Sequence, residues 1–221
     1  LVEVVFIDVN ELLSEIKKIL KKYKITVGIL SNVGFIAEYK MQKLQNLVNL
    51  LVLSSFTNVP FNNLYETVET LGVDRIALVA AAVKKYAKRN ILIIDAGTCI
   101  TFDFVNDQSE YLGGAISPGL SLRFKSMNNF TEKLPLINSF ETGPQLIGNS
   151  TESCLKSGVI NGLVSEITGF IKRFKILSPN LTIFLTGGDA IFLGDELKND
   201  IFVDPYLVLK GLNKLIQLNE N

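Results

Sequence analysis

The chain has 221 residues, 48% of them hydrophobic, which is enough to bury a sizeable core in one large domain or two small ones. Its 22 basic and 22 acidic residues balance, so we expect neither a nucleic-acid partner nor a membrane partner. The sequence contains no histidine, which excludes Ser-His-Asp triads, Cys-His pairs and histidine metal sites. Proton transfer would therefore fall to a carboxylate, Lys, Tyr or Cys.

Cysteine content and hydropathy indicate where the protein works. Cys99 and Cys154 are too few, and too far apart in sequence, to suggest a disulfide framework or a zinc site. No apolar run approaches the ~18 residues of a membrane helix, and no signal peptide is visible. We therefore expect a cytoplasmic protein.

The first half of the chain predicts alternating strands and helices. Residues 1–6 are strand-like, and Asn10 is placed to cap a helix whose apolar residues recur over 12–23. Further strands are predicted at 25–30 and 47–53, and helices at 36–45 and 76–88.

The second half repeats and extends this order. An antiparallel pair of strands is predicted over 91–105, and further strands at 111–117, 181–185 and 201–203. Helices are predicted after Gly119, over 151–174, after residue 185 and from Pro205. Residues 130–149 are predicted to be a loop. The order is β-β-β-α-β-α-β-α, and the first half has its later part without the opening hairpin. We therefore expect an α/β protein with two tandem halves, residues 1–89 and 90–221, and a cleft between them.

Residues 91–105 are the most informative stretch. A buried strand ends at Asp95, the chain turns at Gly97, and Thr98 presents a hydroxyl. Gly97 has no Cβ, so a phosphate could approach the backbone closely, and Asp95 could hold a cation that offsets the phosphate charge. The alternative is an ordinary β-hairpin turn, in which Asp and Gly are common.

Two further motifs favour the phosphate interpretation. Gly72-Val73-Asp74-Arg75 precedes a predicted helix, and Thr186-Gly187-Gly188-Asp189 follows a predicted strand. Free N–H groups at helix starts favour anions. Taken singly, Asp74 and Asp189 could merely cap helices.

Together these motifs resemble those of type III pantothenate kinases, bacterial members of the superfamily that includes acetate and sugar kinases, Hsp70 and actin. The matching segments, in order, are Tyr65, 72–75, 95–98, 113–114 with 117–119, 148–151 and 186–189. The resemblance implies two ribonuclease H-like domains of the actin-like ATPase kind. It also implies ATP-dependent phosphorylation of pantothenate, the first step of coenzyme A biosynthesis.

The resemblance gives the acceptor side its roles. Asp74 would be the general base, and Arg75 would balance charge or bind the substrate carboxylate. Gly72 and Val73 would supply pocket backbone, Tyr65 would contact pantothenate, and Thr151 would reach the substrate from its own subunit or from the neighbouring subunit of a homodimer. The alternatives are a surface salt bridge for Arg75, core packing for Tyr65 and a helix N-cap for Thr151.

On the nucleotide side, the resemblance makes Asp95 the ligand of a monovalent cation, K⁺ or NH₄⁺. Gly97 and Thr98 would face ATP phosphates, Gly187 and Gly188 would let adenosine lie against the backbone, and Mg²⁺ would accompany ATP. Asp103 is expected to be a solvated strand residue without a role.

The family also has an N-terminal Asp-x-Gly-Asn-Thr phosphate loop that this sequence lacks, and we expect the chain to begin about one hairpin late. Two other functions stay open: a related kinase with another acceptor alcohol, and a non-catalytic nucleotide-binding regulatory protein.

Overall fold

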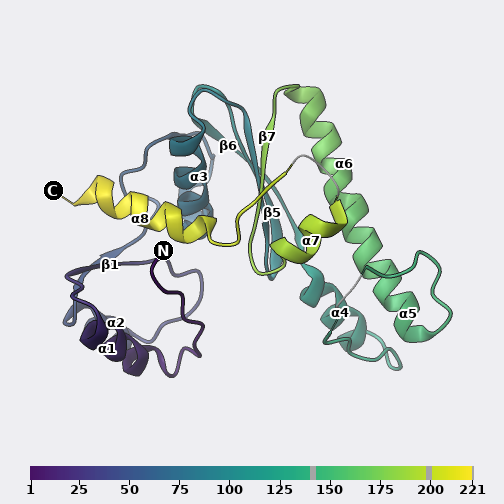
Figure 1. Ribbon diagram of the computed structural model, residues 1–221, viewed down its shortest axis with the longest axis horizontal. Coiled ribbons are helices and arrows are strands. Elements are labelled where there is room, and N and C mark those ends of the chain that lie inside the picture. The colour runs from purple at the N-terminus through teal and green to yellow at the C-terminus, as the bar shows by residue number, and fades with distance from the viewer. Residues whose placement is uncertain (140–142, 198–200, 221) are drawn as a thin grey trace.

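The computed structural model describes residues 1–139, 143–197 and 201–220, which form a mixed α/β fold (Figure 1). The strands are β1 (Val27–Leu30), β2 (Asn49–Val52), β3 (Asn62–Asn63), β4 (Ile91–Ala96), β5 (Cys99–Val105), β6 (Glu110–Pro118), β7 (Thr182–Thr186) and β8 (Phe202–Val203). The helices are α1 (Leu12–Lys22), α2 (Glu38–Gln45), α3 (Val73–Lys85), α4 (Leu120–Asn129), α5 (Thr151–Lys156), α6 (Gly162–Leu177), α7 (Ala190–Leu197) and α8 (Leu207–Asn219).

The main sheet has six strands in the order β3-β6-β5-β4-β7-β8. β4, β5 and β6 form an antiparallel meander, as the sequence predicts, whereas β7 runs parallel to β4 and β8 parallel to β7. The edge strand β3 comes from the first half of the chain and pairs in parallel with β6. β1 and β2 form a separate parallel pair.

Part of the element order recurs along the chain. Apart from the two-residue β3, the segment from β1 to α3 runs β1-α2-β2-α3, the same order as β7-α7-β8-α8, and both strand pairs are parallel. The last helices of the two segments, α3 and α8, pack together on one side of the main sheet (Figure 1). They approach so closely that a Cβ at Gly211 would lie 1.8 Å from the carbonyl oxygen of Ala77.

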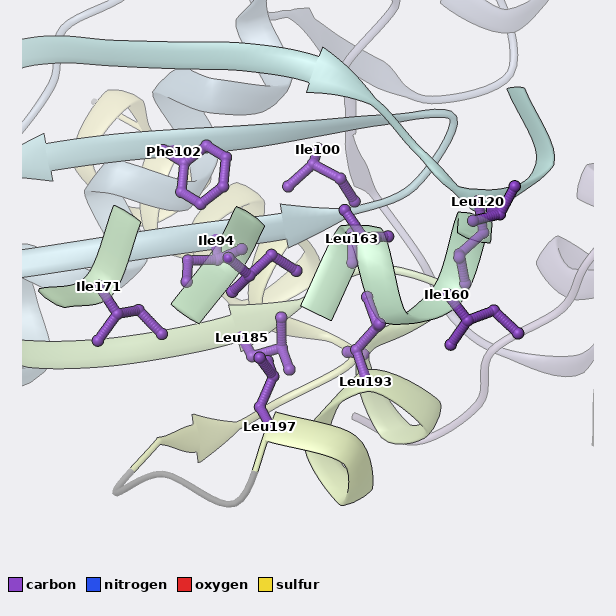
Figure 2. Packing of buried hydrophobic residues seen from close by; sticks show 14 of the residues in the cluster. Ile94, Ile100, Phe102, Leu120, Ile160, Leu163, Ile171, Leu185, Leu193 and Leu197 are labelled. Carbon is purple, nitrogen blue, oxygen red and sulfur yellow. The ribbon is translucent and has the colours of Figure 1, made fainter. Parts of the chain in front are cut away.

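Alternating side chains of the central strands fill two cores, one on each face of the sheet. On one face, Ile94 and Phe102 pack against residues of α4, α6 and α7 (Figure 2). On the other face, Ile91 and Ile93 pack against α3 and α8. Both faces of β4 are therefore covered, which explains its nearly continuous apolar sequence.

Most predicted elements are present, with differences at the ends of the chain and of the helices. Residues 1–6 are not a strand, because no described segment pairs with them. Asn10 does not cap α1; Glu11 occupies that position without a side-chain cap. α3 begins at Val73, earlier than predicted, so Asp74 and Arg75 lie in its first turn.

The predicted long helix is continuous but not uniform. α5 and α6 are joined by a π-helical turn at Ser157–Asn161, and the helix extends to Leu177. Of the preceding predicted loop, residues 140–142 lie outside the described residues, and the rest contains no helix or strand. Among the described residues, no helix combines the length and the apolar character needed to cross a bilayer.

Candidate functional site

Several of the predicted motifs meet at one end of the main sheet. Asp95 at the carboxyl end of β4 pairs with Thr186 at the end of β7. The β4–β5 turn at Gly97 and Thr98 lies beside the start of α4, where the N–H of Gly119 donates to the carbonyl of Thr98 over 3.0 Å. Thr98 itself is exposed at this end of the sheet.

Gly187 closes the opposite side of this end of the sheet. Its φ is +96°, which favours glycine. A Cβ on Gly187 would lie 2.4 Å from both Oδ1 of Asp95 and the carbonyl oxygen of Ala96. The next residue, Gly188, is exposed and a Cβ there would meet open space. Gly187 is thus needed for close packing on Asp95, whereas Gly188 leaves an open backbone surface.

Strand alternation places three polar side chains on the face of the sheet that α3 covers. Asp95 follows Ile91 and Ile93 in the same alternation, and these two pack against α3 and α8. Asp95 pairs with Thr101 on β5, and Ile93 pairs with Asp103. Asp95, Thr101 and Asp103 therefore lie on one side of the sheet, below the start of α3.

The structure overturns the prediction for Asp103, which is fully buried rather than solvated. Its Oδ1 accepts a hydrogen bond from Nε of Arg75 at 2.8 Å, and Nη2 of Arg75 lies 2.6 Å from the same oxygen. Arg75 is only 6% exposed, so its salt bridge is a buried one and not the surface pair considered above. The physical reason is that α3 covers this face of β5, which a strand pattern alone does not reveal.

Two hydroxyls complete the bonding of Asp103. Tyr111 donates to Oδ1 at 2.7 Å, and Thr101 donates to Oδ2 at 2.9 Å. Burial and the Asp103 carboxylate raise the pKa of Tyr111, so its hydroxyl stays protonated as a donor. Burial lowers the pKa of Arg75, but the attraction of Asp103 outweighs it and the net pKa is raised. Both oxygens of the Asp103 carboxylate therefore accept hydrogen bonds from protein donors.

Tyr65 lies beside this network. Its ring stacks on that of Tyr111, with centroids 6.0 Å apart and planes inclined by 13°. The Arg75 guanidinium carbon lies 5.5 Å from the centre of the Tyr65 ring. Gly113, with φ +95°, makes room for the ring, since a Cβ there would lie 3.1 Å from Cδ2 of Tyr65. Tyr65 is half-buried, so it packs on the core and still borders the surface.

Asp74 lies in the first turn of α3, at the edge of the same site. Its Oδ1 accepts a hydrogen bond from the backbone N–H of Arg75 at 2.9 Å. Burial raises the pKa of Asp95 to about 6, and the negative charges of Asp74 and Asp103 add to the shift. Arg75, the residue after Asp74, bonds to Asp103 on the face of the sheet that also carries Asp95, so the two predicted motifs lie on the same side of the sheet.

The charge at this site is suited to a cation. In the described part of the chain, neither Asp74 nor Asp95 forms an ion pair with a lysine or arginine. Arg75 does not neutralise them, because its Nε and Nη2 both bond to Asp103. The donors are oxygens, which hard cations prefer. No described cluster contains three or more metal-binding side chains, so a cation here would need backbone, water or substrate oxygens as further ligands.

Thr151 does not join this site within one chain. It is the exposed first residue of α5, which lies across the molecule from α3 (Figure 1). The N-cap is Ser150, whose hydroxyl accepts from the N–H of Ser153, so the alternative role of Thr151 as the cap is wrong. Thr151 lines an open hollow of about 670 Å³ together with Met127, Leu134 and the 148–150 turn.

The sequence reasoning missed the residues that hold the site together. Besides Asp103 and Tyr111, it missed Glu166 on α6, which accepts from Ser117 at 2.5 Å and pairs with Arg123 at 2.6 Å. These contacts fix the junction of β6 and α4 beside the Thr98 turn. A usable signal for Asp103 was its position between two phenylalanines on a strand, since an acid in such surroundings needs a partner.

Another hollow, of about 580 Å³, lies at the other end of the sheet. It is lined by Lys88, Arg89, Asn90, Asp107, Asn180, Leu181 and Thr182. None of the predicted site residues lines it, so the candidate site stays at the carboxyl ends of β4 and β7.

The fold and this end of the sheet define a class: an α/β protein in which two carboxylates without a lysine or arginine partner in the described residues lie near the glycine-containing turn that follows β4. The sequence profile of type III pantothenate kinases matches residues 7–173. The chain belongs to the type III pantothenate kinase family.

Curated relatives agree with this assignment over nearly the whole chain. The chain is 45% identical to the type III pantothenate kinase of Flavobacterium psychrophilum over 219 residues, which are 98% of this chain and 90% of the relative. It is 48% identical to that of Christiangramia forsetii over 87% of this chain and 79% of the relative. It is 44% identical to that of Bacteroides fragilis over 99% and 90%.

Among solved structures, the fold is similar to that of a Campylobacter jejuni protein assigned to the Baf family of transcriptional activators. The TM-score is 0.63 and the identity 26%, covering 93% of this chain and 89% of the other. The similarity extends over both the β1–β2 part and the six-stranded part of the chain.

Proposed function

We propose that this protein transfers the γ-phosphoryl group of ATP to the primary alcohol of pantothenate, giving 4′-phosphopantothenate for coenzyme A biosynthesis. The observation that supports it best is that the Asp74-Arg75 motif and Asp95 lie on one face of the sheet, joined through the bond from Arg75 to Asp103, in a chain of this family. An acceptor hydroxyl at Asp74 and phosphates at the turn after Asp95 would then be neighbours.

In this proposal Asp74 is the general base. Its carboxylate would accept the proton of the acceptor hydroxyl as that oxygen attacks the γ-phosphorus, in line with the leaving oxygen of ADP. Because Asp74 belongs to the first turn of α3, the helix backbone fixes its position. Positioning of this kind supplies much of the catalysis in phosphoryl transfer.

The other acceptor-side residues would shape the pocket. Tyr65 offers a half-buried ring at the edge of the site, and Gly72 and Val73 offer backbone beside it. Arg75 has less freedom than the resemblance implies, since two of its nitrogens bond to Asp103. It would approach a substrate carboxylate only with the nitrogen edge that remains.

The nucleotide side would use backbone more than side chains. Gly97 and Thr98 would face the phosphates, and the open backbone at Gly188, next to Gly187, would face adenosine. Asp95 would hold K⁺ or NH₄⁺, and Mg²⁺ would accompany ATP; these cations supply positive charge that offsets the phosphate charge.

We also propose a homodimer in the cytoplasm. Thr151 begins α5, which lies across the molecule from α3, the helix that carries Asp74 (Figure 1), so Thr151 would reach the acceptor pocket from the neighbouring subunit. The free, exposed thiols of Cys99 and Cys154 suit a reducing compartment. Residues 1–89 and 90–221 remain our proposed halves, joined where α3 packs on α8.

The test is phosphorylation of pantothenate by the purified protein with ATP and Mg²⁺, in KCl and in choline chloride of equal ionic strength. We expect turnover that depends on K⁺, and we expect Asp74→Asn to lower kcat by at least about 100-fold. The control variant is Asp107→Asn, at an exposed turn at the other end of the sheet. Asp74→Asn turning over at the wild-type rate would refute the assigned base.

A second candidate function is regulatory, and the similarity to the Campylobacter jejuni Baf family protein favours it. In that case the protein would bind ATP without phosphorylating pantothenate. Calorimetric binding of ATP together with no turnover on pantothenate would favour this candidate. Turnover on another primary alcohol would instead favour a related kinase with a different acceptor, because acceptor pockets vary on one fold.

A further inference from the structure

The buried Arg75–Asp103 pair links two parts of the site that come from distant segments. Arg75 lies in the first turn of α3, directly after Asp74. Asp103 lies in the middle of β5, two residues from Thr101, which pairs with Asp95 on β4. A single ion pair thus connects the segment that carries Asp74 to the strands that carry Asp95.

The bonding of Asp103 makes this link a rigid one. Its carboxylate accepts from Arg75 and Tyr111 on one oxygen and from Thr101 on the other. Nε and Nη2 of Arg75 both reach Oδ1, so the guanidinium cannot rotate without losing two contacts. The ring of Tyr65 lies beside the guanidinium and limits its movement on that side.

The start of α3 has little else to hold its polar groups. Within the described ranges, the one hydrogen bond of the Asp74 side chain is to the N–H of Arg75, in its own turn. The N-cap is Gly72, which offers no side-chain cap. Among the described residues, Arg75 is the only side chain of this turn that forms an ion pair.

We propose that Asp103 is a positioning residue: through its ion pair with Arg75 it fixes the first turn of α3 over β5, and so sets the spacing between the Asp74 and Asp95 carboxylates. The spacing matters because a cation and the transferred phosphoryl group must fit between the two motifs. This inference rests on the proposed function for its catalytic consequence but not for its structural part.

The structural part is tested by hydrogen exchange in the purified full chain. The N–H groups of Arg75 and Ile76 both donate to the carbonyl of Gly72, so their exchange reports on the first turn of α3. Asp103→Asn should speed this exchange by about tenfold or more relative to the amides of residues 80–85 in the same helix. The matched control is Tyr111→Phe, which removes one donor from Asp103 and leaves the ion pair. This variant should not speed the exchange of these two amides.

If Asp103→Asn does not fold, Arg75→Lys serves for the same measurement, because it keeps the charge and loses the two-nitrogen contact. The proposal is wrong if amide exchange speeds up equally along the whole of α3, or if it does not change at all.

The catalytic part is tested by a double-mutant cycle on kcat, measured per folded enzyme. If Asp103 acts through Asp74, Asp103→Asn lowers kcat by about 100-fold in the wild type, but by less than about threefold when Asp74 is already Asn. A merely structural role changes the folded fraction and leaves kcat per folded enzyme the same, which would contradict the proposal. If the wild type itself does not phosphorylate pantothenate, the proposed function fails, and the exchange measurement still decides the structural part.

Discussion

Gly72 lies directly against the carboxylate of Asp74. Its φ of −58° is open to any residue, so the backbone conformation does not require glycine. The requirement comes from Asp74: a Cβ on Gly72 would lie 2.5 Å from Oδ1 of Asp74. The glycine of the Gly72-Val73-Asp74-Arg75 motif is therefore needed because any larger side chain would collide with Asp74.

Replacing Gly72 by Ala should consequently move the Asp74 side chain off the Arg75 N–H. We expect kcat to fall by roughly 10- to 100-fold, because small displacements of a catalytic group are costly. Stability should change by no more than about 1 kcal/mol, since Asp74 can rotate towards solvent. Gly34→Ala is the matched control, because a Cβ there meets nothing closer than 4.0 Å. A Gly72→Ala enzyme with wild-type kcat would show that this position of Asp74 is unimportant.

Burial of the Asp95 carboxylate lowers the free energy of unfolding when the group is charged. Its proposed role as a cation ligand gives a reason for this cost. Its pKa of about 6 lies above the ordinary value near 4, so the folded state holds the proton more tightly than the unfolded state. A raised carboxyl pKa gives stability that is present below about pH 4 and is lost as pH rises towards 6. Asp95→Asn should remove this dependence.

We therefore expect Asp95→Asn to be more stable than wild type at pH 8 without K⁺, by on the order of 2 kcal/mol, and equally stable near pH 4. Added KCl should raise the Tm of the wild type and not that of the variant, with choline chloride as the ionic control. Urea unfolding at pH 4, 6 and 8 measures the difference. A variant that follows the wild-type pH profile would contradict the assignment of this pKa.

At the scale of elements, the sequence predicted strands and helices well where one periodicity dominates. The apolar run at 91–94 and the turn at 97–98 gave β4, the meander and the position of Asp95. The sequence could not show which helix covers which face of the sheet. For that reason it missed the burial of Asp103, although it found both motifs that this residue connects.

Short and end elements were also beyond sequence reasoning. β3 has two residues, Asn62–Asn63, and exists because β6 offers it an edge. Residues 1–6 are apolar enough for a strand, yet no described segment pairs with them. In both cases, whether a strand forms depends on a pairing segment that is distant in sequence, and the local composition does not reveal whether such a segment is present.

The packing of α3 on α8 is itself testable through Gly211. A Cβ at Gly211 would collide with the carbonyl of Ala77, so Gly211→Ala must push the helices apart. We expect a loss of about 1–3 kcal/mol in the free energy of unfolding, with a fall in kcat because α3 carries Asp74. Gly169→Ala in α6, where a Cβ meets nothing within 4 Å, should instead stabilise by about 0.5–1 kcal/mol. Equal effects of the two substitutions would mean that the close approach is not maintained in solution.

At the scale of the whole molecule, the arrangement separates Thr151 from the carboxylates. α5 and α3 lie on opposite sides of the main sheet, at different ends of the molecule (Figure 1). Within one chain, α5, which begins with Thr151, packs into the core on one face of the sheet, and α3, which carries Asp74, packs into the core on the other face. In the proposed homodimer, the second subunit would supply the Thr151 that reaches the acceptor pocket.

Mixed dimers test this directly. Asp74→Asn and Thr151→Ala should each be nearly inactive alone if both residues serve the acceptor. After the two variants are unfolded together and refolded, or co-expressed, half of the dimers are mixed. Each mixed dimer has one site with Asp74 from one subunit and Thr151 from the other, and one site that lacks both. Activity should therefore return to about a quarter of the wild-type value. Chains that supply both residues to their own site would show no recovery on mixing, and the shared pocket would then be wrong.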